Sequence, residues 1–150
     1  MIEHVWTVVC SKSVIDSQSN VISLLEVLEQ INITGPSVNL PAGTAGYIPI
    51  SFDVVSLWTR EDENHPCRGL ARINLIEPSG EILSSLEHDV DLRTNKGLRN
   101  ITRIQGLPFR KLGRHWLQVQ IRLEGQNNWQ DKIKIPLDIL QIEPAKATTS

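Results

Sequence analysis

The sequence has little cysteine, few aromatic residues and no long apolar segment, and each shortage excludes a class of protein. Its 150 residues include two cysteines, Cys10 and Cys67, which are too few for the disulfide framework of a small secreted domain. No stretch reaches the roughly 18 consecutive apolar residues of a membrane-spanning helix. The start, MIEHVWTVVCSK, lacks the basic region and small-residue cleavage site of a secretory signal. We therefore expect a cytoplasmic protein with free thiols and no membrane contact.

The familiar signatures of catalysis and nucleotide binding are also missing. The chain has no GxGxxG, Walker A, HExxH, CxxC or GxSxG segment. The segment EHDVD offers His88 with Asp89 and Asp91, and ENHPC offers His65 with Cys67, but neither has a recognised ligand spacing. In a strand, His88 would also point away from the two aspartates. We expect no catalytic residues, no cofactor and no metal site.

The overall composition is that of an ordinary folded domain. Hydrophobic residues make up 40% of the chain and charged residues 21%, as is typical of folded globular proteins. A chain of this length fits one domain, which buries about 68–70% of its unfolded surface. We predict a single domain over residues 1–143. Residues 144–150 form a predicted flexible tail, because small polar residues cannot offset the entropy cost of ordering.

Period-two alternation is the strongest local pattern. In HWLQVQIRL, Leu117 and Val119 fall on one side of an extended chain, and Gln118 and Gln120 on the other. The segment KIKIPLDIL repeats the pattern. Its Pro136 cannot donate to a ladder, which predicts a strand that lies at an edge or breaks there. The residues EGQNNW between the two segments are typical of a hairpin loop.

Further strands are predicted in HVWTVVCS, in YIPISFDVVSLWT and on both sides of a turn in CRGLARINLIEPSGEIL. Pro78 and Gly80 suit positions i+1 and i+3 of a type I turn. About seven to nine short strands with no alternating helices predict an all-β fold, an antiparallel β-sandwich.

Residues 21–33, VISLLEVLEQINI, are ambiguous between a helix and a strand. Several apolar residues fall at helical spacing, and Ser23 with Glu26 could form a capping box. However, Ile22, Val27 and Ile33 would lie outside the apolar stripe of that helix. We favour a strand with a bulge.

The segment INLIEPSGEIL, followed by LPFRKLGRHWLQVQIRLEG, resembles the C-terminal half of many Ig-like domains. In those domains a strand ending in a Pro-x-Gly turn precedes a Gly-x-aromatic strand. Gly113 and Trp116 occupy the corresponding places, with Trp116 one residue late and the usual Tyr absent. With VVCSKSVIDSQSNVISLLEVLEQI, the chain as a whole is similar to a group of small bacterial proteins of unknown function predicted to form such sandwiches. The resemblance implies an Ig-like fold and a strand over residues 21–33, but no catalytic or binding residues.

Positive charge is concentrated in residues 92–123, which contain eight Lys or Arg and no Asp or Glu, although the chain has a net charge of −2. We favour solvated strand faces that pair with acidic neighbours. The alternative is an anion-binding site for nucleic acid or a phosphorylated ligand. Its candidate residues are Arg99, Arg103, Arg110, Lys111 and Arg114. The segment lacks the interleaved aromatic residues of a typical nucleic-acid binder, which disfavours that partner.

Four tryptophans, Trp6, Trp58, Trp116 and Trp129, stand out in a chain with 5% aromatic residues. Exposed rings could form a platform for sugars, but we expect two or three of them to pack in the core or to cap its ends. The leading functional hypothesis is a non-enzymatic cytoplasmic binding or scaffold module that acts through protein–protein contacts. Because edge strands can pair with another chain, self-association is a natural form of such contact.

Overall fold

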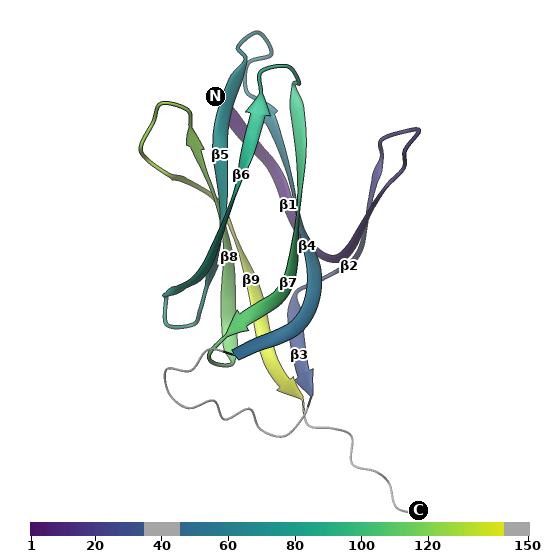
Figure 1. The fold of residues 1–150 in the computed structure, drawn as a ribbon, viewed down its shortest axis with the longest axis vertical. Helices are drawn as coiled ribbons and strands as arrows, with labels where there is room; N and C mark the ends of the chain where they lie inside the picture. Colours follow the sequence, from purple (N-terminus) through teal and green to yellow (C-terminus); the bar gives the residue numbers. More distant parts are fainter. Residues whose placement is uncertain (35–45, 143–150) are drawn as a thin grey trace, which may run out of the picture.

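A computed structural model of the protein describes residues 1–34 and 46–142 and is all-β (Figure 1). The predicted tail, residues 144–150, lies outside the described residues. Within the two described ranges, no helix is long and apolar enough to cross a membrane. The strands in these ranges are β1 (Ile2–Ile15), β2 (Ile22–Val27), β3 (Gln30–Thr34), β4 (Gly46–Arg60), β5 (Cys67–Ile76), β6 (Ile82–Leu92), β7 (Gly97–Phe109), β8 (Gly113–Leu123) and β9 (Gln130–Ile142).

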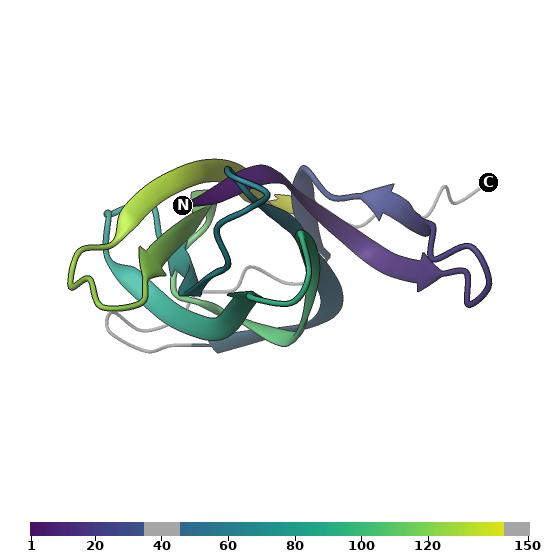
Figure 2. The same ribbon diagram turned by 90° about the horizontal axis from the view of Figure 1, so that it is seen from above.

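The strands form two sheets that curve around a shared interior (Figure 2). Sheet A has the order β2-β1-β4-β7 and is antiparallel throughout. Sheet B has the order β3-β9-β8-β5-β6 and is antiparallel except that β3 runs parallel to β9. The predicted all-β class is confirmed, but the expectation of purely antiparallel pairing is wrong at β3.

The parallel pair arises because the chain changes sheets between β2 and β3. The amide of Leu28 still bonds to the carbonyl of Val9 in β1, at 2.8 Å, whereas the carbonyl of Glu29 already accepts from Asp138 of β9, at 3.3 Å. Two residues thus carry the chain from sheet A to sheet B, and β3 lies beside β9 in the same direction. Local apolar pattern carries no information about strand direction.

Residues 21–33 are extended, so the strand prediction is confirmed and the helical alternative is wrong. The extended segment is interrupted at Glu26, whose φ of 55° lies in the left-handed region that non-glycine residues seldom adopt. The Glu26 carboxylate accepts a hydrogen bond from the Ser11 hydroxyl at 2.8 Å. This irregularity lies within β2, one residue before the strand ends at Val27.

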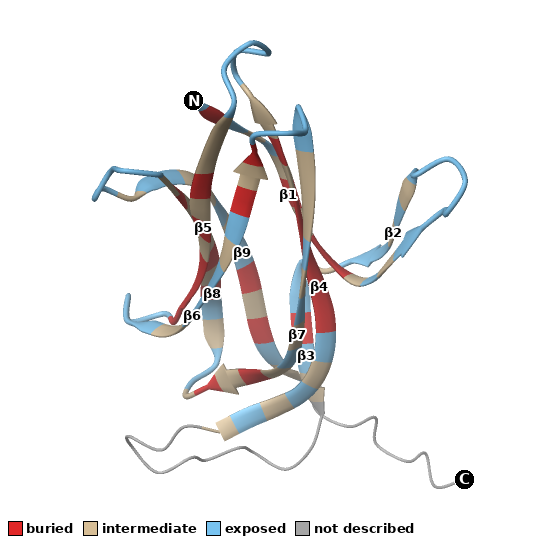
Figure 3. Ribbon diagram, turned by 45° about the horizontal axis from the view of Figure 1, so that its top comes forward, coloured by how far each residue is buried: buried red, intermediate tan, exposed pale blue. Residues whose placement is uncertain are grey.

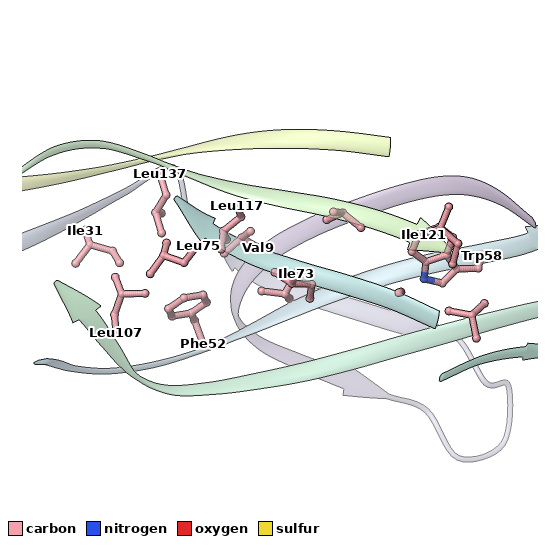
Figure 4. Packing of buried hydrophobic residues seen from close by; sticks show 14 of the residues in the cluster. Val9, Ile31, Phe52, Trp58, Ile73, Leu75, Leu107, Leu117, Ile121 and Leu137 are labelled. Atoms are coloured by element: carbon pink, nitrogen blue, oxygen red, sulfur yellow. The ribbon is translucent and has the colours of Figure 1, made fainter. Parts of the chain in front are cut away.

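The core lies between the two sheets, where the alternating apolar residues meet (Figure 4). Leu117, Val119 and Ile121 of β8 are at most 1% exposed, as their alternation predicted. From sheet A, Phe52 and Trp58 contribute the largest fully buried side chains. Of the four tryptophans only Trp58 belongs to this cluster, and the other three are partly exposed. One tryptophan thus packs in the core, whereas two or three were expected to pack there or to cap its ends.

The predicted turn after β5 is confirmed. The amide of Gly80 donates to the carbonyl of Glu77 at 2.9 Å, and Gly80 has a φ of 95° that glycine adopts without strain. Gly113, at the start of β8, has a φ of 122°, and a Cβ atom there would lie 3.3 Å from Cγ of Pro78. The β5–β6 turn therefore packs closely against the β7–β8 turn.

Pro136 neither ends β9 nor places the whole strand at an edge. On one side it faces Trp116 of β8, and on the other side β9 is open until β3 begins to pair at Asp138. The amide of Asp138 points toward β3, so position 136, two residues earlier, directs its nitrogen to the same open side. Pro136 therefore removes no ladder hydrogen bond, because no described strand pairs with β9 on that side. The predicted edge position is correct for this part of β9 but not for the whole strand.

We expect Phe52→Ala to lower the free energy of unfolding by about 3–5 kcal/mol, because it leaves a cavity between the sheets. Urea denaturation followed by tryptophan fluorescence measures the change. Tyr47→Ala is the matched control: Tyr47 is 75% exposed, and its loss should change stability by less than about 0.5 kcal/mol. Equal effects of the two substitutions would contradict the assigned core.

Candidate functional site

The five candidate anion-binding residues are divided between the two sheets. Arg99 and Arg103 lie on β7 in sheet A, whereas Arg114 lies on β8 in sheet B. Arg110 and Lys111 occupy the turn that joins these strands. The residues are close in sequence, but the chain changes sheets between them.

Three of these five candidate residues already form an ion pair with a carboxylate of the protein. Arg110 donates to both oxygens of Glu77, at 3.1 and 2.7 Å. Arg114 makes the same two-pronged contact with Asp138, at 2.8 and 3.0 Å. Arg103 lies 3.6 Å from Asp53. An anionic ligand at these positions would have to compete with carboxylates that the fold supplies.

The pairing of Glu77 with Arg110 ties two turns together. The Glu77 side chain is only 2% exposed, and it also accepts a hydrogen bond from the Ser79 hydroxyl at 2.5 Å. The hydrogen bond from Ser79 lowers the pKa of Glu77. Burial of the carboxylate opposes this effect, but the pairing with Arg110 adds to it, and the pKa stays below its usual value. Arg110 also contacts Glu81. The contacts of Arg110 thus fix the β5–β6 turn to the β7–β8 turn.

A cluster of arginine and tryptophan on the outer face of sheet B was not found by sequence reasoning. The guanidinium carbon of Arg72 lies 4.0 Å from the ring centre of Trp129, and that of Arg122 lies 4.9 Å from it. Arg72 also donates twice to the side-chain oxygen of Gln120, at 2.9 and 2.6 Å. Within the described residues, neither Arg72 nor Arg122 has a carboxylate partner. Only the cross-strand register brings these residues together, so no local pattern could have indicated them.

The hairpin of β1 and β2, residues 10–27, projects from the body as an arm (Figures 1 and 2). Burial colouring shows the arm as largely exposed (Figure 3). In the described part of the chain β2 pairs with β1 alone, so its outer edge is free. The arm carries five of the exposed large hydrophobic residues: Val14, Ile15, Val21, Leu25 and Val27.

A second open region lies between the edge strands β6 and β7. A cleft of about 360 Å³ opens there. Its residues come from four strands: Ile73, Leu75, Ser84, Leu86, Arg103, Ile104, Gln105, Gly106, Leu107, Pro108 and Leu117. The lining is mostly aliphatic and includes core residues, which is typical of a binding cleft.

The described residues contain no group of three or more His, Cys, Asp or Glu side chains placed to share a metal ion. No protein-family model matches the sequence, and a search of the curated proteins found no match. Functional assignment therefore rests on the residues and their geometry. Two features of the described residues that can receive a partner are the free edge of the arm and the β6–β7 cleft.

We expect Arg110→Gln to lower the melting temperature more than Arg93→Gln. The first substitution leaves the buried Glu77 carboxylate without its cation, whereas Arg93 pairs with the exposed Asp91. Adding Glu77→Gln to Arg110→Gln should restore part of the loss, because the unpaired charge is removed. Thermal unfolding monitored by circular dichroism provides the comparison, and equal losses in the two single variants would refute a structural role for the pair.

We also expect stability to fall as the pH drops below about 6.5. Burial lowers the pKa values of His4, His88 and His115 from 6.5. The unfolded chain then binds more protons than the folded one, so the stabilisation is complete above the unfolded pKa and decreases below it. Urea midpoints between pH 7.5 and pH 5.5 test this. His115→Gln should flatten the dependence, and an unchanged slope in this variant would contradict the role of its burial.

Proposed function

We propose that this chain is a non-enzymatic binding or scaffold module in the cytoplasm, built on an Ig-like β-sandwich, that acts through protein–protein contacts. The fold assignment is supported by two facing sheets with one aliphatic core. It is supported further by the Pro-x-Gly turn after β5 and by the pairing of β5 with β8, the strand that carries Trp116. Both cysteines are free thiols, as expected in a reducing compartment.

The observation that carries the proposal is the exposed arm. A two-stranded hairpin is at best marginally stable in water. Beyond Cys10, where β1 leaves β4, the described β1 and β2 pair with each other alone, and side-chain bonds such as those of Ser13 with Asp53 and of Arg99 with Asn20 tie them to the body. Its free edge has one charged residue, Glu26, but neither the Lys nor the Pro that commonly protects an edge strand. Pairing with another strand would satisfy the edge and cover the apolar side chains.

A second copy of the chain is the partner that this edge fits most simply. Two β2 strands that pair in antiparallel fashion are related by a two-fold axis, so the contact is closed and self-complementary. If Leu25 faces its own copy, Glu26 lies opposite Leu24 of the other chain, and no like charges meet. The paired arms would form a four-stranded sheet, β1-β2-β2-β1, which is above the size at which strands become independently stable.

We expect the protein to dimerise with rising concentration and Leu25→Lys to prevent this, because a lysine on β2 places two charges in the paired edge. Multi-angle light scattering over a concentration series measures the mass. Leu112→Lys is the matched control: Leu112 is about as exposed as Leu25, at 41% against 47%, but lies in the β7–β8 turn. A wild-type protein that stays monomeric at every concentration would overturn the role of the arm.

A further inference from the structure

The cleft between β6 and β7 is bounded by two free strand edges. β6 is the last strand of sheet B and β7 the last strand of sheet A, and no described strand pairs with either on the cleft side. Near the hairpin that joins them the strands are close, since the Asn100 side chain donates to the carbonyl of Asp89 at 3.3 Å. Farther from the hairpin the cleft opens between Ser84 and Leu86 on β6 and residues 103–108 on β7.

A bulge interrupts the pairing of β4 with β7 beside the cleft. Ile48 of β4 pairs with Leu107, but Ser51 pairs with Gln105, so β4 has one extra residue at this point. Gly106 of β7 has a φ of 81°, which glycine permits. Bulges bend and twist a sheet locally and are common beside functional sites. Here the bend lies at the residues of β7 that line the cleft.

The floor of the cleft is the hydrophobic core itself. Ile73, Leu75 and Leu117 line it from β5 and β8 and are at most 3% exposed. Figure 4 shows Leu75 and Leu117 close to each other on the inner side of sheet B. On the wall, Leu86 of β6 is 43% exposed. An apolar side chain inserted here would cover Leu86 and contact the core.

The outer face of β7 is positively charged. Arg99 and Arg103 alternate with Ile101 on this face, opposite Leu57 and Asp53 of β4, and β7 contains no acidic residue. Arg103 is 56% exposed, and its contact with Asp53 is long, at 3.6 Å. The other oxygen of Asp53 is already bound by the amide and hydroxyl of Ser13. Arg99 donates only to a backbone carbonyl, that of Asn20.

From these features we infer that the cleft binds an extended peptide segment of a partner protein, in which acidic and apolar residues alternate. This inference rests on the proposed function as a protein-binding module and assigns it a second site. The segment adds as a strand to the free edge of β7. Its apolar side chains enter the cleft beside Ile104, and its acidic side chains lie outward beside Arg103.

Charge and backbone favour a peptide over another apolar occupant. An acyl chain would fill the apolar floor, but it would leave the backbone groups of both edges without partners. A strand satisfies the open part of one edge, and alternation then places every second residue outward, on the side of Arg103. The same arginine disfavours a basic peptide of identical apolar pattern.

The test uses a fluorescein-labelled heptapeptide of sequence Glu-Val-Glu-Leu-Glu-Val-Glu and the full chain, followed by fluorescence anisotropy. We expect saturable binding that weakens as salt is raised, and no binding of the matched peptide in which lysine replaces every glutamate. Arg103→Glu should weaken binding about fivefold, since a cross-strand attraction becomes a repulsion. Arg93→Glu is the control, because Arg93 is similarly exposed, at 53%, but lies in the hairpin at the far end of β6 and β7.

Ser84→Trp provides a second test, because an indole at this position would fill the cleft from β6 without altering the charge of β7. It should abolish binding, provided that circular dichroism shows the variant to be folded; Ser84→Ala, which adds no bulk, should bind as the wild type does. Equal binding by Arg103→Glu and the wild type, or binding of the lysine peptide, would overturn the inference. So would saturable binding of laurate that excludes the peptide, since it would identify the occupant as an acyl chain.

The proposed dimer contact of the arm and the proposed peptide site in the cleft can be tested independently. Leu25→Lys should bind the heptapeptide as the wild type does, because the arm is not part of the cleft. Loss of peptide binding in Ser84→Trp with unchanged dimerisation supports a cleft that is independent of the arm. A protein that dimerises through the arm but binds no peptide at low salt would overturn the cleft and leave the proposed function standing.

Discussion

The fold depends on burial of aliphatic side chains between two sheets that, in the described residues, share no strand ladder. Within each sheet the backbone is bonded strand to strand, but between sheets the attraction comes from packing. Phe52 from sheet A and Leu117 from sheet B belong to one buried cluster, which excludes water from the interior. Because packing has no direction, it holds the sheets face to face without closing their edges.

This arrangement leaves strand edges open, and the edges differ in whether another segment covers them. At β9 the edge is covered by β3 from Asp138 onward, and Pro136 removes a donor where cover is lacking. At the four outermost strands, β2, β7, β3 and β6, no described strand pairs on the outer side. Three of them, β2, β6 and β7, also carry exposed aliphatic residues, including Leu25, Leu86 and Ile101. Edges of this kind pair with other chains unless they are protected, which is why the proposed contacts lie at edges and not on faces.

Local pattern was sufficient to predict most of the strands, although not β7, and the turn after β5. Alternation identified the buried side of β8, and Pro78 with Gly80 marked a turn whose hydrogen bond the structure contains. It did not predict that β3 runs parallel to β9, because strand direction depends on where the chain crosses between sheets. Nor did it predict the cluster of Arg72 and Trp129, which only the pairing of β5, β8 and β9 brings together.

The concentration of positive charge in residues 92–123 shows most clearly why a sequence pattern and a surface differ. β7 joins sheet A and β8 joins sheet B, so the basic strands separate and each lies beside a strand that carries carboxylates. Arg103 is directly opposite Asp53, and Arg114 is directly opposite Asp138. Opposite charges at facing positions favour one register over its neighbours, since a shift of one residue would reverse every side chain. Charge on the sheet faces thus helps to align strands, while Arg103 on the edge strand β7 stays 56% exposed and open to the proposed peptide.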